Sequence, residues 1–86
     1  MKTIELIEKV ERLGLETDVD DFDILIKIKE YRIICSINRS QCFQLDMDWY
    51  ATELIGDVVK EELLRIVLQY ASTPIDEREK TRWFWW

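Results

Sequence analysis

The chain has 86 residues, 48% of them hydrophobic and 35% charged, and carries a formal net charge of −6. This length predicts a single domain, residues 1–86, with a small core. The negative charge disfavours direct binding to nucleic acid or to anionic lipid, since both attract basic surfaces. The sequence contains no histidine, which removes the commonest general base and the commonest metal ligand.

The N-terminal segment predicts a helix over residues 2–13. Its apolar residues recur at helical spacing along one side, and charged residues fill the other. Gly14 then stands where a helix C-terminal glycine is expected. The following acidic stretch, residues 16–23, is short and leads directly into strand-like sequence, so we interpret it as a connection.

From Phe22 the apolar residues alternate with a period of two, which is typical of strands. Three such runs, 22–28, 31–37 and 43–47, predict an antiparallel meander. A three-residue loop, 38–40, keeps Ile33, Cys35 and Ile37 on the same face as Phe43, Leu45 and Met47 by placing Cys35 opposite Phe43. Cys42 then points to the other face, so we expect no disulfide.

The C-terminal half predicts two more helices and a last strand. Residues 49–57 are compatible with a short helix or a loop. A main helix over 58–71, with Asp57 as its N-cap, is expected to pack on the sheet. Thr73 and Pro74 predict a short helix over about 74–80, with Arg78 paired to a nearby carboxylate, and the aromatic run 82–86 predicts a fourth strand at the sheet edge. The predicted fold class is α+β.

The segment Tyr70 to Trp85, YASTPIDEREKTRWFW, resembles the C-terminal signature of small accessory proteins from phages and prophages of Gram-positive bacteria. In that signature a helix ends in a Tyr-Ala or Phe-Ala pair and runs into a Thr-Pro step. An acidic-Arg-Glu triplet and a basic-aromatic end follow. The chain departs from the signature by ending in tryptophans where tyrosines and a longer polar tail are expected. The resemblance implies a phage-encoded protein made in a bacterial host, and small acidic phage proteins include inhibitors of defence nucleases such as anti-CRISPR proteins.

Neither cysteine chemistry nor metal chemistry is predicted. Cys35 and Cys42 lack the further ligands that a zinc site needs, and no histidine is present to activate a thiol. The spacing D-x-D-D-x-D from Asp18 to Asp23 lacks the glycine and the final glutamate of a hand-type calcium loop. We therefore expect no enzyme activity, no cofactor and no metal.

Two groups of residues are the candidate partner-binding sites. The acidic stretch is either a solvated connection or an edge that mimics phosphates in the basic groove of a host protein. In the predicted last strand, Trp83 and Trp85 share one face and Phe84 and Trp86 share the other, so one aromatic pair stays available to a partner. The candidate residues are Glu16, Asp18, Asp20, Asp21, Asp23, Trp83, Trp85 and Trp86.

The sequence predicts a non-enzymatic protein that binds a host protein in the bacterial cytoplasm. No run approaches the roughly 20 apolar residues of a membrane span, and the acidic residues near the N-terminus are unlike a signal peptide. The partner class that suits an acidic surface is a basic, nucleic-acid-binding defence effector. The alternative is a structural accessory protein that forms a homodimer through its aromatic C-terminal strand.

Overall fold

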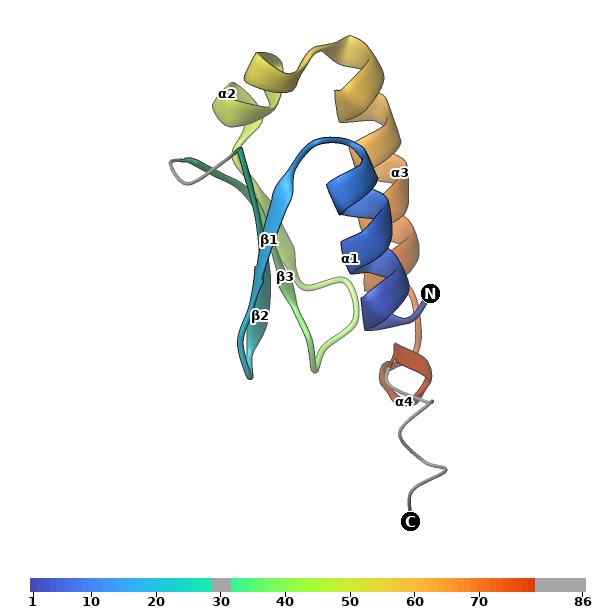
Figure 1. Cartoon of the computed structure of the whole chain (residues 1–86). Helices are drawn as coiled ribbons and strands as arrows, with labels where there is room; N and C mark the ends of the chain where they lie inside the picture. The colour runs from blue at the N-terminus through green and yellow to red at the C-terminus, as the bar shows by residue number, and fades with distance from the viewer. Residues whose placement is uncertain (29–31, 79–86) are drawn as a thin grey trace.

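A computed structural model describes residues 1–28 and 32–78. Within these residues, helices pack on one face of a four-stranded antiparallel sheet (Figure 1), which confirms the α+β class. The element order is α1 Thr3–Arg12, β1 Glu16–Val19, β2 Asp23–Ile28, β3 Arg32–Asn38, β4 Leu45–Met47, α2 Trp49–Thr52, the 3-10 turn η1 Glu53–Ile55, α3 Asp57–Ala71 and α4 Ile75–Arg78. None of the described helices combines the length and the apolar character needed to cross a membrane.

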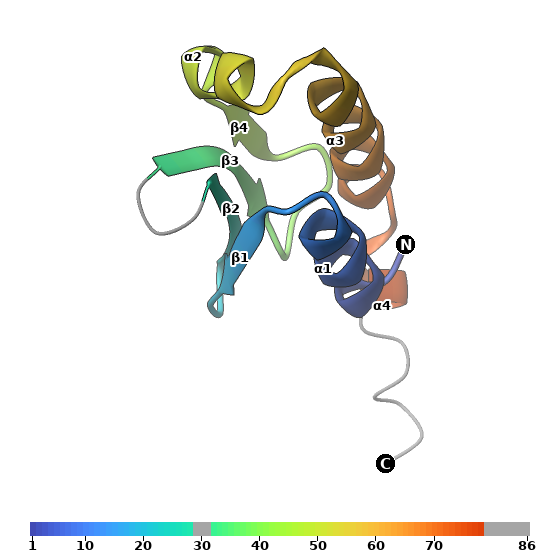
Figure 2. The same ribbon diagram turned by 45° about the horizontal axis from the view of Figure 1, so that its top comes forward.

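The core lies between the sheet and the helix pair α1 and α3, which run side by side (Figure 2). α1 and α3 both form where the sequence predicted them, because one stripe of each is apolar. Full burial of one such side chain stabilises the fold by roughly 1.5–3 kcal/mol. The central buried side chains are Leu6 and Val10 of α1, Ile24 and Ile26 of β2, Cys35 and Ile37 of β3, and Leu63, Val67 and Tyr70 of α3.

β1 is a strand in the region that the sequence analysis interpreted as a connection, and that interpretation was wrong. Thr17 and Val19 pair with inward-facing residues of β2, and both are β-branched residues that favour strands. Glu16 and Asp18 alternate with them and point away from the helices. The acidic residues concealed a strand because Val19 is the only apolar residue of β1 and none of its four side chains is buried.

A β-bulge changes the inward-facing residues at the start of β3. The β2–β3 register shifts at this point, so that Ile26 pairs with Cys35 while Lys27 pairs with Ile33. Ile34 is the extra residue and is fully buried, whereas Ile33 is 46% exposed. The prediction that Ile33 faces the core was therefore wrong, because an extra residue inverts the alternation on one side of it.

The β3–β4 register differs from the predicted one by an even number of residues. Cys35 pairs with Met47, not with Phe43, and the connection covers residues 39–44 in place of 38–40. An even shift leaves every side chain of β4 on its original face. Leu45 and Met47 consequently still pack against the core, as the alternation predicted.

Phe43, expected inside the sheet, lies in the connection and is exposed. It has a positive φ of 59°, and its backbone N–H donates to the carbonyl of Ala71 at 2.9 Å. Both cysteines are free thiols, with Cys35 buried and Cys42 half-buried. The Cys42 thiol donates to the Thr73 carbonyl at 3.2 Å, so this loop is attached to the end of α3 at two points.

The segment between β4 and α3 forms a compact pair of turns. Asp48 caps α2, and its side chain accepts the backbone N–H groups of Tyr50 and Ala51, each at 3.1 Å. The main helix begins at Asp57, one residue before the predicted start. The residue that precedes it is Gly56, whose φ of 84° suits glycine, so the prediction of Asp57 as N-cap was wrong.

Arg78, at the end of α4, is buried at 1% exposure and is not the surface ion-pair partner that the sequence predicted. Its guanidinium donates to the carbonyls of Ala71 at 3.0 Å, Thr73 at 3.2 Å, Asn38 at 2.9 Å and Arg39 at 3.2 Å. These acceptors belong to the end of α3, the step into α4, the last residue of β3 and the β3–β4 connection. Residues 79–80 of the predicted helix and the predicted strand 82–86 lie outside the described residues.

Two features of the surroundings of Arg78 explain how its charged guanidinium is accommodated in the interior. The carbonyls at the end of α3 form the negative end of the helix dipole, which favours a cation. The guanidinium carbon also lies 4.3 Å from the centre of the Tyr70 ring, a favourable cation–π distance. The Tyr70 hydroxyl in turn bonds the Thr3 hydroxyl at 2.7 Å, which extends the network to α1.

Arg78→Met should lower the free energy of unfolding by roughly 2–4 kcal/mol, because several buried carbonyls lose a charged donor at once. Urea unfolding followed by circular dichroism measures this. Arg65→Met is the matched control, since Arg65 is exposed on α3 and pairs only with the neighbouring Glu62 in the described contacts. Its expected effect is within about 0.5 kcal/mol, and equal losses in the two variants would contradict the anchoring role.

Candidate functional site

The sheet face turned away from the helices carries a line of residues from all four strands. Asp18 pairs with Leu25, Leu25 with Ser36, and Ser36 with Asp46. Directly opposed residues of antiparallel strands project to the same side. The two end positions of this line, on β1 and β4, are both aspartates.

Further acidic side chains lie on the same face. Glu16 pairs with Lys27, and Asp23 pairs with Asn38, so both carboxylates share the outward side. Lys27 offsets part of the charge, since its ammonium lies 2.6 Å from an Asp18 carboxylate oxygen. We call the carboxylates of Glu16, Asp18, Asp23 and Asp46 the acidic sheet face.

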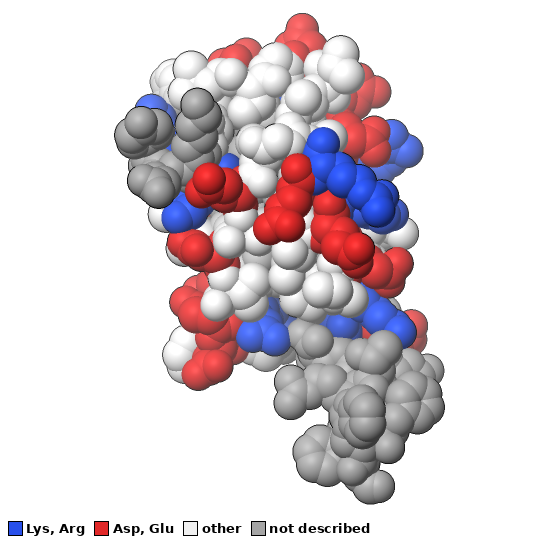
Figure 3. All heavy atoms as spheres, viewed as in Figure 1, with Lys and Arg blue, Asp and Glu red and all other residues white. Residues whose placement is uncertain are grey.

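No described helix covers the acidic sheet face, because α1 and α3 both lie on the other side (Figure 1). In the space-filling view, acidic side chains gather along the margin of the molecule formed by β1 and β2 (Figure 3). A shallow hollow on this face is lined by Asp23, Ser36, Asn38, Gln44, Leu45 and Asp46. The face is thus open and rich in hydrogen-bond acceptors.

Asp20 and Asp21 extend this acidity into the β1–β2 turn. The Asp20 carboxylate accepts the backbone N–H groups of Phe22 and Asp23, each at 2.7 Å. These bonds, first from Asp23 and then from Phe22, lower the pKa of Asp20, and the charge of Arg39 adds to the effect. They also make Phe22 a turn residue, which is why β2 begins at Asp23 and not at Phe22 as predicted.

The hydrogen bonds to the Asp20 carboxylate predict how the stability of the fold changes at acid pH. The folded-state pKa of Asp20 lies below its unfolded value, so its stabilisation is present above about pH 4 and is lost as the pH falls through the folded value. Asp20→Asn keeps an oxygen acceptor but cannot titrate. Its urea midpoint should therefore fall less than that of the native chain between pH 5 and pH 2.5.

Asp21→Asn is the control for this measurement, since Asp21 is exposed in the same turn. Its pH profile should follow that of the native chain. Parallel profiles for Asp20→Asn and the native chain would show that the backbone bonds to Asp20 do not contribute to stability.

The structure brings together only the acidic part of the predicted site. Glu16, Asp18 and Asp23 share the sheet face, and Asp20 and Asp21 lie in the adjoining turn. Trp83, Trp85 and Trp86 lie outside the described residues. Asp46 was not among the predicted site residues, although the alternation in 43–47 already placed it on the side opposite to the core. It joins the site only because β1 is a strand of the same sheet.

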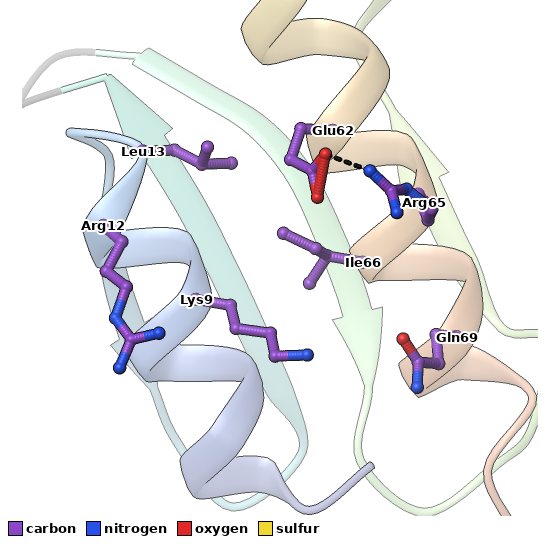
Figure 4. A pocket seen from close by; sticks show the side chains of 7 residues that line it. All are labelled: Lys9, Arg12, Leu13, Glu62, Arg65, Ile66 and Gln69. Carbon is purple, nitrogen blue, oxygen red and sulfur yellow. Dashed lines mark hydrogen bonds and ion pairs between the residues drawn. The ribbon is translucent and has the colours of Figure 1, made fainter.

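A groove on the opposite side, between α1 and α3, has a different character (Figure 4). Leu13 and Ile66 contribute its apolar surface, while Lys9 and Arg65 add cationic groups at its rim. Arg65 is paired with Glu62. The groove is lined by Lys9, Arg12, Leu13, Glu62, Arg65, Ile66 and Gln69, a mixture without an assembled nucleophile or acid–base pair.

Reactive groups are also not assembled elsewhere in the described ranges. Burial, and secondarily the charge of Asp46, raise the pKa of the Cys35 thiol to about 12, so this thiol stays protonated at neutral pH. Residues 1–28 and 32–78 contain no cluster of side chains that could hold a metal ion. No family model, curated protein or solved structure matches this chain.

Proposed function

We propose that this chain is a non-enzymatic, phage-encoded protein that binds a basic host protein through its acidic sheet face. A nucleic-acid-binding defence effector is the partner class that this chemistry suits, and the protein then acts as an inhibitor in the manner of an anti-CRISPR protein. The resemblance of residues 70–85 to accessory proteins of phages supports the origin. The open acidic sheet face supports the mode of binding, and it is the observation on which the proposal rests.

The carboxylates are held at fixed separations by the strands that carry them. Glu16 and Asp18 are two residues apart on β1, about 7 Å along the strand. Asp18 and Asp46 lie at opposite ends of a four-strand line, which corresponds to about 14 Å across the sheet. Such an array loses little conformational freedom on binding and presents negative charge over the width of a groove that normally holds phosphates.

The charge distribution also favours fast and selective association with a basic partner. A surface of one sign steers a partner of the opposite sign and suppresses acidic competitors. The turn with Asp20 and Asp21 continues the negative surface beyond the end of β1. Because the exposed charges are screened within about 10 Å at 0.1 M salt, binding through this face should weaken steeply as salt increases.

The proposal is tested by quantitative capture from a lysate of a Gram-positive host at low salt. The native chain is compared with a variant that carries Glu16→Gln, Asp18→Asn, Asp23→Asn and Asp46→Asn. We expect a basic, nucleic-acid-binding protein to be recovered by the native chain and lost with the variant. With the purified partner, the association rate constant should fall at least about tenfold at 50 mM salt and much less at 0.5 M.

A charge-matched control distinguishes the sheet face from net charge alone. Glu8→Gln, Glu61→Gln, Asp76→Asn and Glu77→Gln remove the same number of exposed charges from the helices and should leave recovery intact. The proposal also requires the bound partner to release its nucleic acid. It is wrong if both quadruple variants bind equally, or if the partner keeps its nucleic acid.

A further inference from the structure

α2, η1 and the first turn of α3 form one end of the molecule (Figure 1), and they expose large apolar side chains. Trp49 is 59% exposed, Tyr50 85%, Leu54 67% and Val58 83%. We call these four residues the apolar cap. They fall within ten consecutive positions, and a group of exposed apolar side chains of this kind is typical of an interaction site.

Folding does not account for the apolar cap. The buried residues of α2 are the small side chains Ala51 and Thr52, so the aromatic residues of this helix contribute little to the core. Asp48 fixes the start of the helix through its two backbone bonds. Local hydrogen bonds therefore hold the segment in a conformation that keeps its largest side chains outside.

Acidic groups border the apolar cap. Glu53, Asp57 and Glu61 are exposed in the same segment, and only Glu53 is held by a lysine, with Lys60 at 3.0 Å, among the described ion pairs. A fitting ligand is therefore an aromatic segment with basic residues beside it. The chain itself contains one in residues 79–86, EKTRWFWW, where Lys80 and Arg82 precede four consecutive aromatic residues.

We propose that this aromatic segment, residues 79–86, binds the apolar cap of a second copy of the chain. The aromatic run cannot contact its own cap from its first residue. α3 has 15 residues and is therefore about 22 Å long, with the cap at its beginning and Arg78 bonded to the carbonyl of Ala71 at its end. Fully extended, the chain reaches at most about 18 Å from Arg78 to Trp83 and about 29 Å to Trp86, so a contact that includes Trp83 needs the cap of a second copy.

The positions of the two sites allow the exchange to be mutual. The cap and α4, after which the aromatic segment begins in the sequence, lie at opposite ends of the described part of the molecule (Figures 1 and 2). Two copies placed antiparallel bring each aromatic segment to the cap of the other, and this two-fold arrangement is closed. The inference is independent of the proposed function, because the apolar cap and the acidic sheet face share no residue.

Light scattering during size-exclusion chromatography of the full chain tests the proposal. We expect twice the chain mass of 10.5 kDa for the native chain. A cap variant, Tyr50→Ser with Leu54→Ser, and a segment variant, Trp83, Trp85 and Trp86 all →Ala, should each run at the mass of one chain. Leu68→Ser is the matched control, since Leu68 is 53% exposed on α3 outside the cap, and it should stay dimeric.

Mixing the two monomeric variants identifies the contact itself. The cap variant retains its aromatic segment and the segment variant retains its cap, so an equimolar mixture keeps one complete contact per pair. We expect the mixture to form a heterodimer that neither variant forms with itself, with a dissociation constant well above that of the native dimer.

Several outcomes would overturn the proposal. The native chain could stay monomeric up to millimolar concentration, or it could form oligomers larger than a dimer. The cap variant could remain dimeric, or the mixture of the two variants could fail to associate. Failure of these tests leaves capture by the acidic sheet face unaffected. Conversely, a dimer would persist if the four carboxylates of that face were removed.

Discussion

A single buried guanidinium determines how the two ends of this chain fit together. Arg78 donates to carbonyls of α3, of the step into α4, of the end of β3 and of the β3–β4 connection. Through the Tyr70 ring and the Thr3 hydroxyl the same network reaches α1. All of these carbonyls share the Arg78 guanidinium as their hydrogen-bond donor, so a movement of one element would break its bond to Arg78. The loop, the end of α3 and the sheet are therefore held in a fixed arrangement relative to one another.

Local periodicity was sufficient to predict α1, α3 and the strand character of three segments. It was not sufficient where a residue's position depends on distant partners. The β1 strand has Val19 as its only apolar residue, and its acidic residues resemble a loop until β2 is known to pair with it. The bulge at Ile34, the register of β4 and the bond from Phe43 to Ala71 all join residues far apart in the sequence, which no local pattern reports.

For the candidate site too, local sequence was sufficient for some features, whereas others depend on contacts between distant residues. The sequence identified the acidic residues 16–23, but their arrangement on one face follows from strand parity, which also adds Asp46 from a segment about 25 residues away. Within the segment 70–78, Tyr70 and Arg78 are buried and in contact, so folding constrains the choice of residue at these two positions.

The lengths of the outer strands decide how a partner approaches the sheet. β1 has four residues and carries Glu16 and Asp18, while β4 has only three residues. Short and charged edge strands are poor templates for the addition of another strand. A peptide added along either edge would therefore form few main-chain hydrogen bonds. The partner proposed above would instead meet the broad surface of the sheet with its own side chains, so a rigid array of lysines or arginines is a better match than an extended peptide.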